Sequence, residues 1–201
     1  MATLYEIMDS LDAHIYTLHS DQEIQKPFDC NKEGKTSYNK NKLNDFLFKY
    51  SATTAKFRRY RINIIENENK IIAYFSLAHD SLIVDATDSD FKDYLESYTS
   101  EESREFREEY CKEQSFPAIK IEHLAVDKEY QSRGIGECIL KYIIGEIIEN
   151  DNGYGCQYLT VDALNNSDTN KFYSKFGFQN VTNEDHCAPF RRMYYPLIEL
   201  F

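Results

Sequence analysis

The most regular pattern of apolar and polar residues lies in the middle of the chain, where it predicts a strand, a tight loop and a helix. Ile119, Ile121, Leu124 and Val126 are β-forming residues in a short run that ends at Asp127, as expected for a half-buried or buried strand. After the loop, apolar residues recur at helical spacing, namely Ile135, Ile139, Leu140, Ile143, Ile144, Ile147 and Ile148.

The rest of the chain predicts further strands and short helices. Residues 62–65 and 70–78 form a predicted hairpin around the polar turn 66–69, and residues 43–50 have the spacing of a short amphipathic helix. Residues 2–8 alternate weakly and predict a first strand. Residues 157–161, 178–181 and 190–197 predict later strands. Between the first two of these strands, a short helix is predicted that Ser167 or Asp168 can cap and Gly177 can end.

The loop before the central helix contains Gly134 and Gly136, which suit a phosphate-binding site. The first turn of a helix leaves backbone N–H groups unpaired beside the positive end of the helix dipole, and glycine lets a ligand come close. An ordinary loop-to-helix junction has the same pattern. Ile139 stands where a dinucleotide fingerprint has its third glycine, and no Gly-Lys-Ser/Thr follows, so dinucleotide and nucleoside triphosphate sites are disfavoured.

Two longer patterns are more specific. Leu124-Ala-Val-Asp127 followed by Gln131-x-x-Gly-x-Gly136 resembles the acyl-CoA signature of the GNAT superfamily of N-acetyltransferases. About 35 residues on, Asn166-x-x-Thr169-x-x-Phe-Tyr173-x-Lys-x-Gly-Phe178 resembles the second GNAT signature, with Thr169 in place of alanine. The resemblance implies one α/β (α+β) domain over residues 1–201. Its mixed central sheet would have six to seven strands, with strands four and five splayed apart and helices on both faces.

The resemblance also implies a reaction, in which an amine attacks the thioester of acetyl-CoA directly and no metal takes part. A backbone N–H near Val126 would polarise the thioester carbonyl, and Tyr173 occupies the general-acid position. Glu122 stands where several relatives carry a base, although it could simply pair with a cation; His79 is a lesser candidate. The implied cofactor-binding residues are Leu124, Ala125, Val126, Gln131, Ser132, Arg133, Gly134, Ile135, Gly136 and Asn166.

The N-terminal third resembles one GNAT branch, the toxin-type acetyltransferases, more loosely. The resemblance rests on Phe28-x-Cys30, Leu43-Asn-Asp-Phe-Leu47 and residues 74–77, with Asn31 in place of the branch's glycine. It implies aminoacyl-tRNA as an alternative acceptor to a small-molecule amine or a protein N-terminus. Arg58, Arg59 and Arg61 favour the tRNA.

The overall charge opposes that alternative. Formal net charge is −11, from 34 acidic and 23 basic side chains, which disfavours general attraction to phosphate backbones or anionic membranes. Residues 89–114 contribute nine acidic and four basic side chains. Their aromatic spacing predicts a helical acidic insertion at about 86–115, which would be either a solvated cap or a surface facing a substrate or partner.

Cellular location is predicted from what the sequence lacks. Residues 1–10 have no apolar signal core, and no run is apolar enough to cross a membrane. The five cysteines are widely spaced with no Cys-x-x-Cys, which favours reduced thiols in the cytoplasm and gives no support for zinc. A possible homodimer and a non-catalytic module that binds acyl-CoA or a partner remain open.

Overall fold

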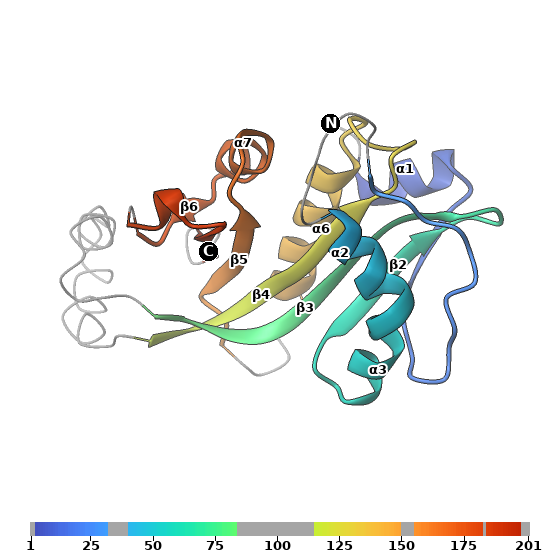
Figure 1. The fold of residues 1–201 in the computed structure, drawn as a ribbon, viewed down its shortest axis with the longest axis horizontal. Helices are drawn as coiled ribbons and strands as arrows, with labels where there is room; N and C mark the ends of the chain where they lie inside the picture. Colours follow the sequence, from blue (N-terminus) through green and yellow to red (C-terminus); the bar gives the residue numbers. More distant parts are fainter. Residues whose placement is uncertain (1–2, 32–39, 84–114, 150–154, 183, 198–201) are drawn as a thin grey trace. The chain divides into compact units, whose positions relative to one another are not determined.

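The computed structural model describes residues 3–31, 40–83, 115–149, 155–182 and 184–197 (Figure 1). Its strands follow the order β1-β2-β3-β4-β5-β7-β6 in a seven-stranded sheet, so the predicted mixed α/β class is confirmed. The strands are β1 (His14–Thr17), β2 (Arg61–Glu66), β3 (Ile71–Ile83), β4 (Ser115–Val126), β5 (Tyr158–Leu164), β6 (Gln179–Asn180) and β7 (Phe190–Pro196). The helices are α1 (Leu4–Ser10), α2 (Lys40–Asp45), η1 (Phe46–Tyr50), α3 (Ser51–Lys56), α6 (Ile135–Glu149), α7 (Ser167–Phe176) and η2 (Glu184–Cys187).

The chain divides into two compact units, which are described separately. The first contains Met1–Ala78 and Ile121–Asn152, and the second contains His79–Lys120 and Gly153–Phe201. The central strand, loop and helix predicted from sequence are β4, residues 127–134 and α6, and the predicted hairpin is β2 and β3. Most of the predicted acidic insertion lies outside the described residues.

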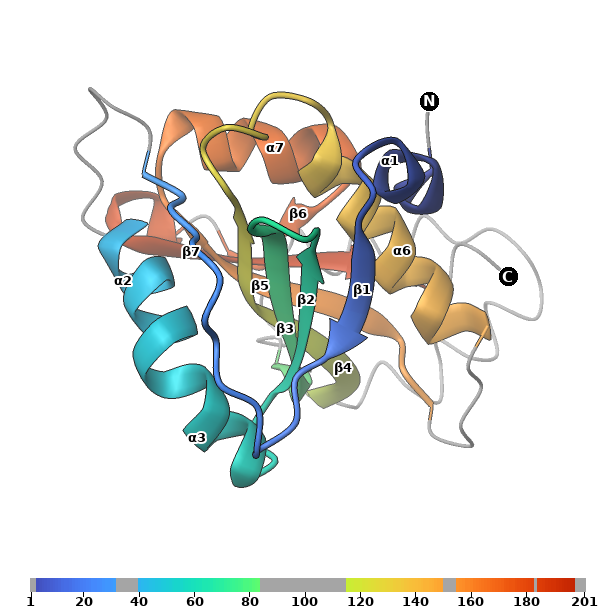
Figure 2. The ribbon, with the colours of Figure 1, turned by 90° about the vertical axis from the view of Figure 1, so that its right-hand side faces the viewer.

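In the first unit, helices cover both faces of the strands. Figure 2 shows α2 and α3 on one side of β1, β2 and β3, with α1 and α6 on the other. Because strand side chains alternate between faces, Tyr74 joins the core cluster of Phe46 and Leu47, whereas Phe75 meets the ring of Tyr142 on α6. Helices on both faces were predicted, and in this unit that prediction is confirmed.

The N-terminal strand predicted at residues 2–8 is wrong, because these residues form helix α1. Thr3 and Glu6 make a reciprocal capping box: the Glu6 N–H donates to the Thr3 hydroxyl at 3.2 Å, and the Thr3 N–H donates to the Glu6 carboxylate at 2.7 Å. Leu4 and Met8, one turn apart, are the buried residues. The first strand comes later, as β1, and pairs antiparallel with β2.

The helix predicted over residues 43–50 is longer and contains a π-helical turn. α2 continues through η1 into α3, which ends at Lys56. A π turn disturbs the regular i to i−4 ladder. The hydroxyls of Ser51 and Thr54 donate to the carbonyls of Leu47 and Tyr50, which satisfies those acceptors across the junction.

The second unit pairs β5 antiparallel with β7, and β7 with β6. The N-cap of helix α7 (Ser167–Phe176) lies one residue before the predicted caps, Ser167 and Asp168. Asn166 is its N-cap and accepts from the N–H of Thr169 at 2.9 Å, so neither Ser167 nor Asp168 has that role. Gly177 ends the helix as predicted, in the left-handed conformation with φ of 111°.

Gly177 should therefore resist substitution, whereas Gly145 should not. A Cβ at Gly177 would be strained at its positive φ and would lie 3.1 Å from the Tyr195 ring, so Gly177→Ala should lower the free energy of unfolding by about 1–2 kcal/mol. Gly145 lies inside α6 with open space around it, and Gly145→Ala should raise that free energy by about 0.5–1 kcal/mol. Urea unfolding of both variants checks the two signs; a stable Gly177→Ala protein would contradict the cap.

Candidate functional site

The loop between β4 and α6 has the geometry of an anion cradle. It starts with a turn in which the N–H groups of Tyr130 and Gln131 donate to the carbonyl of Asp127, at 2.9 and 3.1 Å. Ser132 and Gly134 adopt positive φ angles of 64° and 82°. Gly134 is exposed, with open space where a Cβ would lie. The 15-residue helix α6 follows at once, so its first N–H groups face this loop.

Gln131 braces this loop against two neighbouring segments. Its side-chain amide donates to the carbonyl oxygens of Val126, at the end of β4, and of Cys30, both at 2.9 Å. Those bonds occupy the amide N–H₂ group within the protein. The side chain of Gln131 therefore fixes the position of the loop, and a ligand would meet the backbone that this side chain holds.

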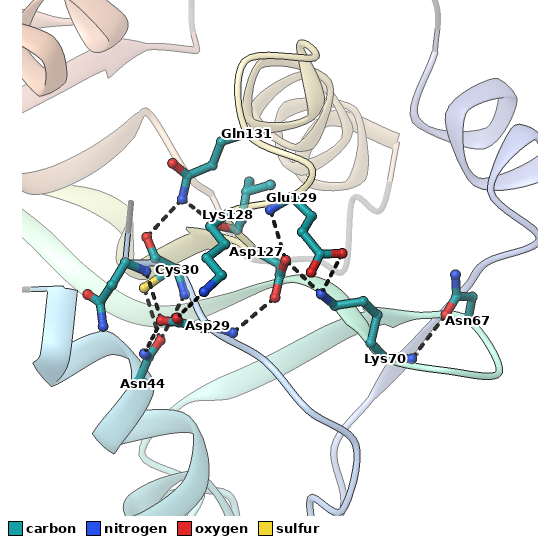
Figure 3. Close-up of polar contacts among 11 residues, drawn as sticks. Asp29, Cys30, Asn44, Asn67, Lys70, Asp127, Lys128, Glu129 and Gln131 are labelled. Atoms are coloured by element: carbon teal, nitrogen blue, oxygen red, sulfur yellow. Dashed lines mark hydrogen bonds and ion pairs between the residues drawn. The ribbon is translucent and has the colours of Figure 1, made fainter. Parts of the chain in front are cut away.

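The carboxylate of Asp127 is the centre of the polar contacts below the loop (Figure 3). It is only 1% exposed, and its Oδ1 accepts from the Glu129 N–H and the Lys70 ammonium, both at 3.0 Å. Its Oδ2 accepts from the N–H of Asp29 at 3.0 Å. The N–H of Asp127 itself donates to the carbonyl of Ile72 at 2.8 Å, so one residue joins β3, β4 and the segment around Asp29.

The side chains of Asp29 and Lys70, two residues that bond to Asp127, both have pKa shifts that favour the charged form. Hydrogen bonds from the Asn31 N–H, and then from Asn44 and Lys128, lower the pKa of Asp29 to about 2. Burial alone would lower the pKa of Lys70, but hydrogen bonds to Asp127 and Glu129 outweigh it and raise that pKa. Sequence reasoning placed Asp127 in the motif but missed Asp29 and Lys70, because nothing local to them signals a partner about 57 or 98 residues away.

The remaining predicted residues of the first unit lie along β4 and at the start of α6. Ala125 and Ile135 are buried, at 4% and 2% exposure. Leu124, Val126, Gly136 and the candidate base Glu122 are half-buried, whereas Ser132 and Arg133 are exposed. Beside Glu122, His123 stacks on the ring of Phe46 with centroids 3.6 Å apart, and its Nδ1 lies 2.8 Å from the Ser76 hydroxyl.

The second unit contains the predicted Tyr173 and Asn166, together with His79, which is exposed. Tyr173 is 6% exposed, and its ring packs edge-on against Phe172 and Phe178. Burial raises the pKa of Tyr173, which keeps the phenol protonated at neutral pH, as a general acid requires. The side-chain oxygen of Asn166 accepts the hydrogen bond of the helix cap described above.

A basic pocket of about 490 Å³ opens elsewhere in the first unit. Lys56, Arg58 and Arg61 line it, together with Thr17, Leu18, His19, Ser20, Ala55 and Tyr60. Arg58 has a φ of 53°, a conformation that costs a residue with a Cβ about 1–2 kcal/mol and that glycine adopts freely. The sequence indicated the basic cluster, but not that residues 17–20 of the chain complete a pocket with it.

Within the described residues, no group of three or more His, Cys, Asp or Glu side chains could hold a metal ion. No helix in the part of the chain that the structure describes is long and apolar enough to cross a membrane.

Comparisons with known proteins confirm the resemblance. Residues 97–180 match the family described as "Acetyltransferase (GNAT) domain". No curated protein matches the sequence. The match contains both signatures on which the resemblance rests, the loop after β4 and the Phe-Tyr helix α7. Over residues 97–180 the chain is therefore similar to this acetyltransferase family.

Solved structures of toxin acetyltransferases share the fold over nearly the whole chain. AtaTR bound with acetyl-CoA is 19% identical with a TM-score of 0.67, covering 94% of this chain and 95% of that one. A tyrosine-to-phenylalanine mutant of KacT is 19% identical with a TM-score of 0.66, covering 94% and 99%. AtaT complexed with acetyl-methionyl-tRNAfMet is 17% identical with a TM-score of 0.67, covering 94% and 97%. At these identities the likeness establishes the GNAT fold.

The acid stability of the protein should depend on Asp29. Its folded-state pKa of about 2 lies below the ordinary 3.8, so its stabilising contribution is complete above about pH 4 and is lost as pH falls toward 2. Asp29→Asn should lower stability at pH 7, and its stability should then fall less steeply than that of the wild type between pH 4 and 2. Urea unfolding at several pH values measures both. Gly177→Ala, which changes no titratable group, should run parallel to the wild type; an equal acid slope for Asp29→Asn would contradict the assignment.

Proposed function

We propose that the protein transfers an acetyl group from acetyl-CoA to a primary amine. The observation that carries the proposal is the loop of residues 131–136: a braced turn with two left-handed residues, set against the N-terminus of a 15-residue helix. That geometry suits the pyrophosphate of coenzyme A. The family match and the acetyl-CoA bound in the AtaTR structure support the same co-substrate.

Each step of the transfer has a candidate residue. Backbone N–H groups of residues 132–136 would bind the pyrophosphate, and β4 from Leu124 to Val126 would hold the pantetheine arm and polarise the thioester carbonyl. The attacking amine nitrogen forms the new C–N bond as the C–S bond breaks. Glu122 would accept the proton that the amine loses, and Tyr173 would give its phenolic proton to the departing sulfur. Asn166 would contribute indirectly to cofactor binding, by capping the N-terminus of helix α7.

Replacing Tyr173 should separate catalysis from binding. Tyr173→Phe keeps the buried ring and removes only the acid, so kcat should fall by about 10²–10⁴-fold while the Kd for acetyl-CoA stays within about twofold of the wild type. Isothermal titration gives the Kd, and release of free thiol in the presence of an amine gives kcat.

The same titration tests the whole proposal. A wild-type protein that does not bind acetyl-CoA at millimolar concentration would refute it. Equal losses of affinity and turnover in Tyr173→Phe would remove only the general-acid role. Tight binding without thiol release across a broad panel of amines would favour a non-catalytic acyl-CoA-binding module.

Among acceptors, the basic pocket favours aminoacyl-tRNA. Lys56, Arg58 and Arg61 lie around one opening of about 490 Å³, and the ring of Tyr60 carries the Arg59 guanidinium 5.3 Å above it. Cations interleaved with an aromatic ring suit a phosphate backbone with an unstacked base. The AtaT structure with acetyl-methionyl-tRNAfMet supports this acceptor class. Because charged tRNA is available in the cytoplasm, we propose that the protein acts there. We also propose that it forms a homodimer.

Arg58 allows a clean test of that acceptor. Arg58→Gly removes the cation but supplies the residue that best tolerates a φ of 53°, so it should not lower the free energy of unfolding. Acetylation of charged tRNA should fall several-fold, and the dependence of log KM on log salt should flatten by about one unit.

The matched control is Lys141→Gln, which makes the same change in charge on the exposed surface of α6. It should leave tRNA acetylation unchanged, and neither variant should alter the Kd for acetyl-CoA. If Arg58→Gly acetylates tRNA as well as the wild type, or if the wild type acetylates only small amines, the tRNA acceptor is wrong.

A further inference from the structure

Two N-terminal motifs noted in the sequence have no part in the chemistry above, yet they meet in the first unit. Phe28 and Phe46 are both buried, at 6% and 7% exposure, and both contact the ring of Tyr74, with centroids 5.5 and 6.1 Å away. The apolar members of the two motifs thus hold α2 and the segment Phe28–Cys30 against one strand residue. Their polar members, Asp29, Cys30 and Asn44, lie together beside this core.

Asn44, on α2, makes three hydrogen bonds to that segment. Its Oδ1 accepts from the N–H of Cys30 and from the Cys30 thiol, both at 3.1 Å. Its Nδ2 donates to the Asp29 carboxylate at 2.9 Å. The partners fix the orientation of the amide, because only an acceptor suits the Cys30 N–H and only a donor suits the carboxylate. Neither aspartate nor leucine, which have similar shapes, can make this set of bonds.

The other side of the same segment is bonded to the proposed cofactor loop (Figure 3). The Asp29 N–H donates to Asp127 at 3.0 Å, and the Asp29 carbonyl accepts from the Lys128 N–H at 2.8 Å. The Lys128 ammonium lies 3.0 Å from the Asp29 carboxylate. The carbonyl of Cys30 accepts from Gln131, the first residue of the loop. Residues 29 and 30 are therefore bonded to α2 on one side and to the loop on the other.

We propose that Asn44 is a positioning residue for the coenzyme A loop, acting through Asp29 and Cys30. The inference rests on the proposed function, since it concerns the same cofactor site. A loop that binds phosphate through backbone N–H groups gains affinity by being held in the binding geometry beforehand. Asn44 is bonded to the segment that is in turn bonded to Lys128 and Gln131. Replacing Asn44 should therefore weaken binding of the phosphates and leave the reaction at the thioester unchanged.

The test compares two acetyl donors that differ in their phosphates. S-Acetylpantetheine carries the same thioester as acetyl-CoA without the pyrophosphate or nucleotide. For Asn44→Ala, the KM and Kd for acetyl-CoA should rise about tenfold with kcat within about twofold, because the three hydrogen bonds that hold residues 29 and 30 are lost. With S-acetylpantetheine, kcat/KM should stay at the wild-type value. A general loss of folded protein would reduce both donors alike.

Three further measurements support the comparison. Asn44→Asp has the same shape but faces the Asp29 carboxylate, and it should show the same selective loss, which provides a second variant if Asn44→Ala fails to fold. Tyr16→Phe removes one hydrogen bond, to Glu66, from β1 of the same unit and should affect neither donor. In a double-mutant cycle with Gln131→Ala, the two fold-losses in acetyl-CoA affinity should not multiply, because both substitutions interrupt the same chain of hydrogen bonds.

The outcomes separate this inference from the proposed function. If the wild type does not bind acetyl-CoA, the proposed function fails. If the wild type binds it and both Asn44 variants keep the Kd within twofold, or lose activity with the two donors equally, the positioning role of Asn44 is overturned and the proposed function stands.

Discussion

The first unit depends on one buried carboxylate, that of Asp127. A charge taken out of water is stable only when several donors replace its hydration, and Asp127 has two backbone N–H groups and the Lys70 ammonium. Two of these donors, from Asp29 and Lys70, are distant in sequence, and the third, from Glu129, lies two residues on. Because burying a charge is costly, a different placement of Asp29 or Lys70 would be penalised: it would remove one of the three donors of the Asp127 carboxylate. The proposed cofactor loop follows this residue, and the turn that starts it is bonded to the Asp127 carbonyl.

This arrangement explains why a loop of small and exposed residues can be well placed. Ser132 and Gly134 are exposed, but the turn before them is bonded to the Asp127 carbonyl and the helix after them has a buried apolar face. Such a loop keeps its N–H groups available without the entropy that a free loop would lose on binding a phosphate. The turn and the helix on either side are held in place, and the residues between them stay exposed. Binding through backbone groups generally requires this combination.

The sequence predicted elements whose signals are local. The period of Ile135 to Ile148 predicted α6, because helical spacing is a property of neighbouring residues. Residues 2–8 were misassigned because weak alternation was preferred to the Thr3–Glu6 capping box, which is the stronger signal. The bonds that place the loop, from Asn44 through Asp29 to Asp127, join segments far apart in sequence, so no local pattern indicates them.

The net charge of the protein disfavours a tRNA acceptor, whereas the local charge of the basic pocket favours one. The distance over which each charge acts decides between the two. The formal charge of −11 acts over the whole molecule, but at physiological salt its field decays over about 8 Å. A phosphate seated in the pocket would lie within contact of Lys56, Arg58 and Arg61. Net charge then slows the encounter with a polyanion, while the pocket determines whether the bound state is stable. An acidic protein can therefore hold a nucleic acid at one basic pocket, and selectivity for that one orientation follows from the repulsion elsewhere.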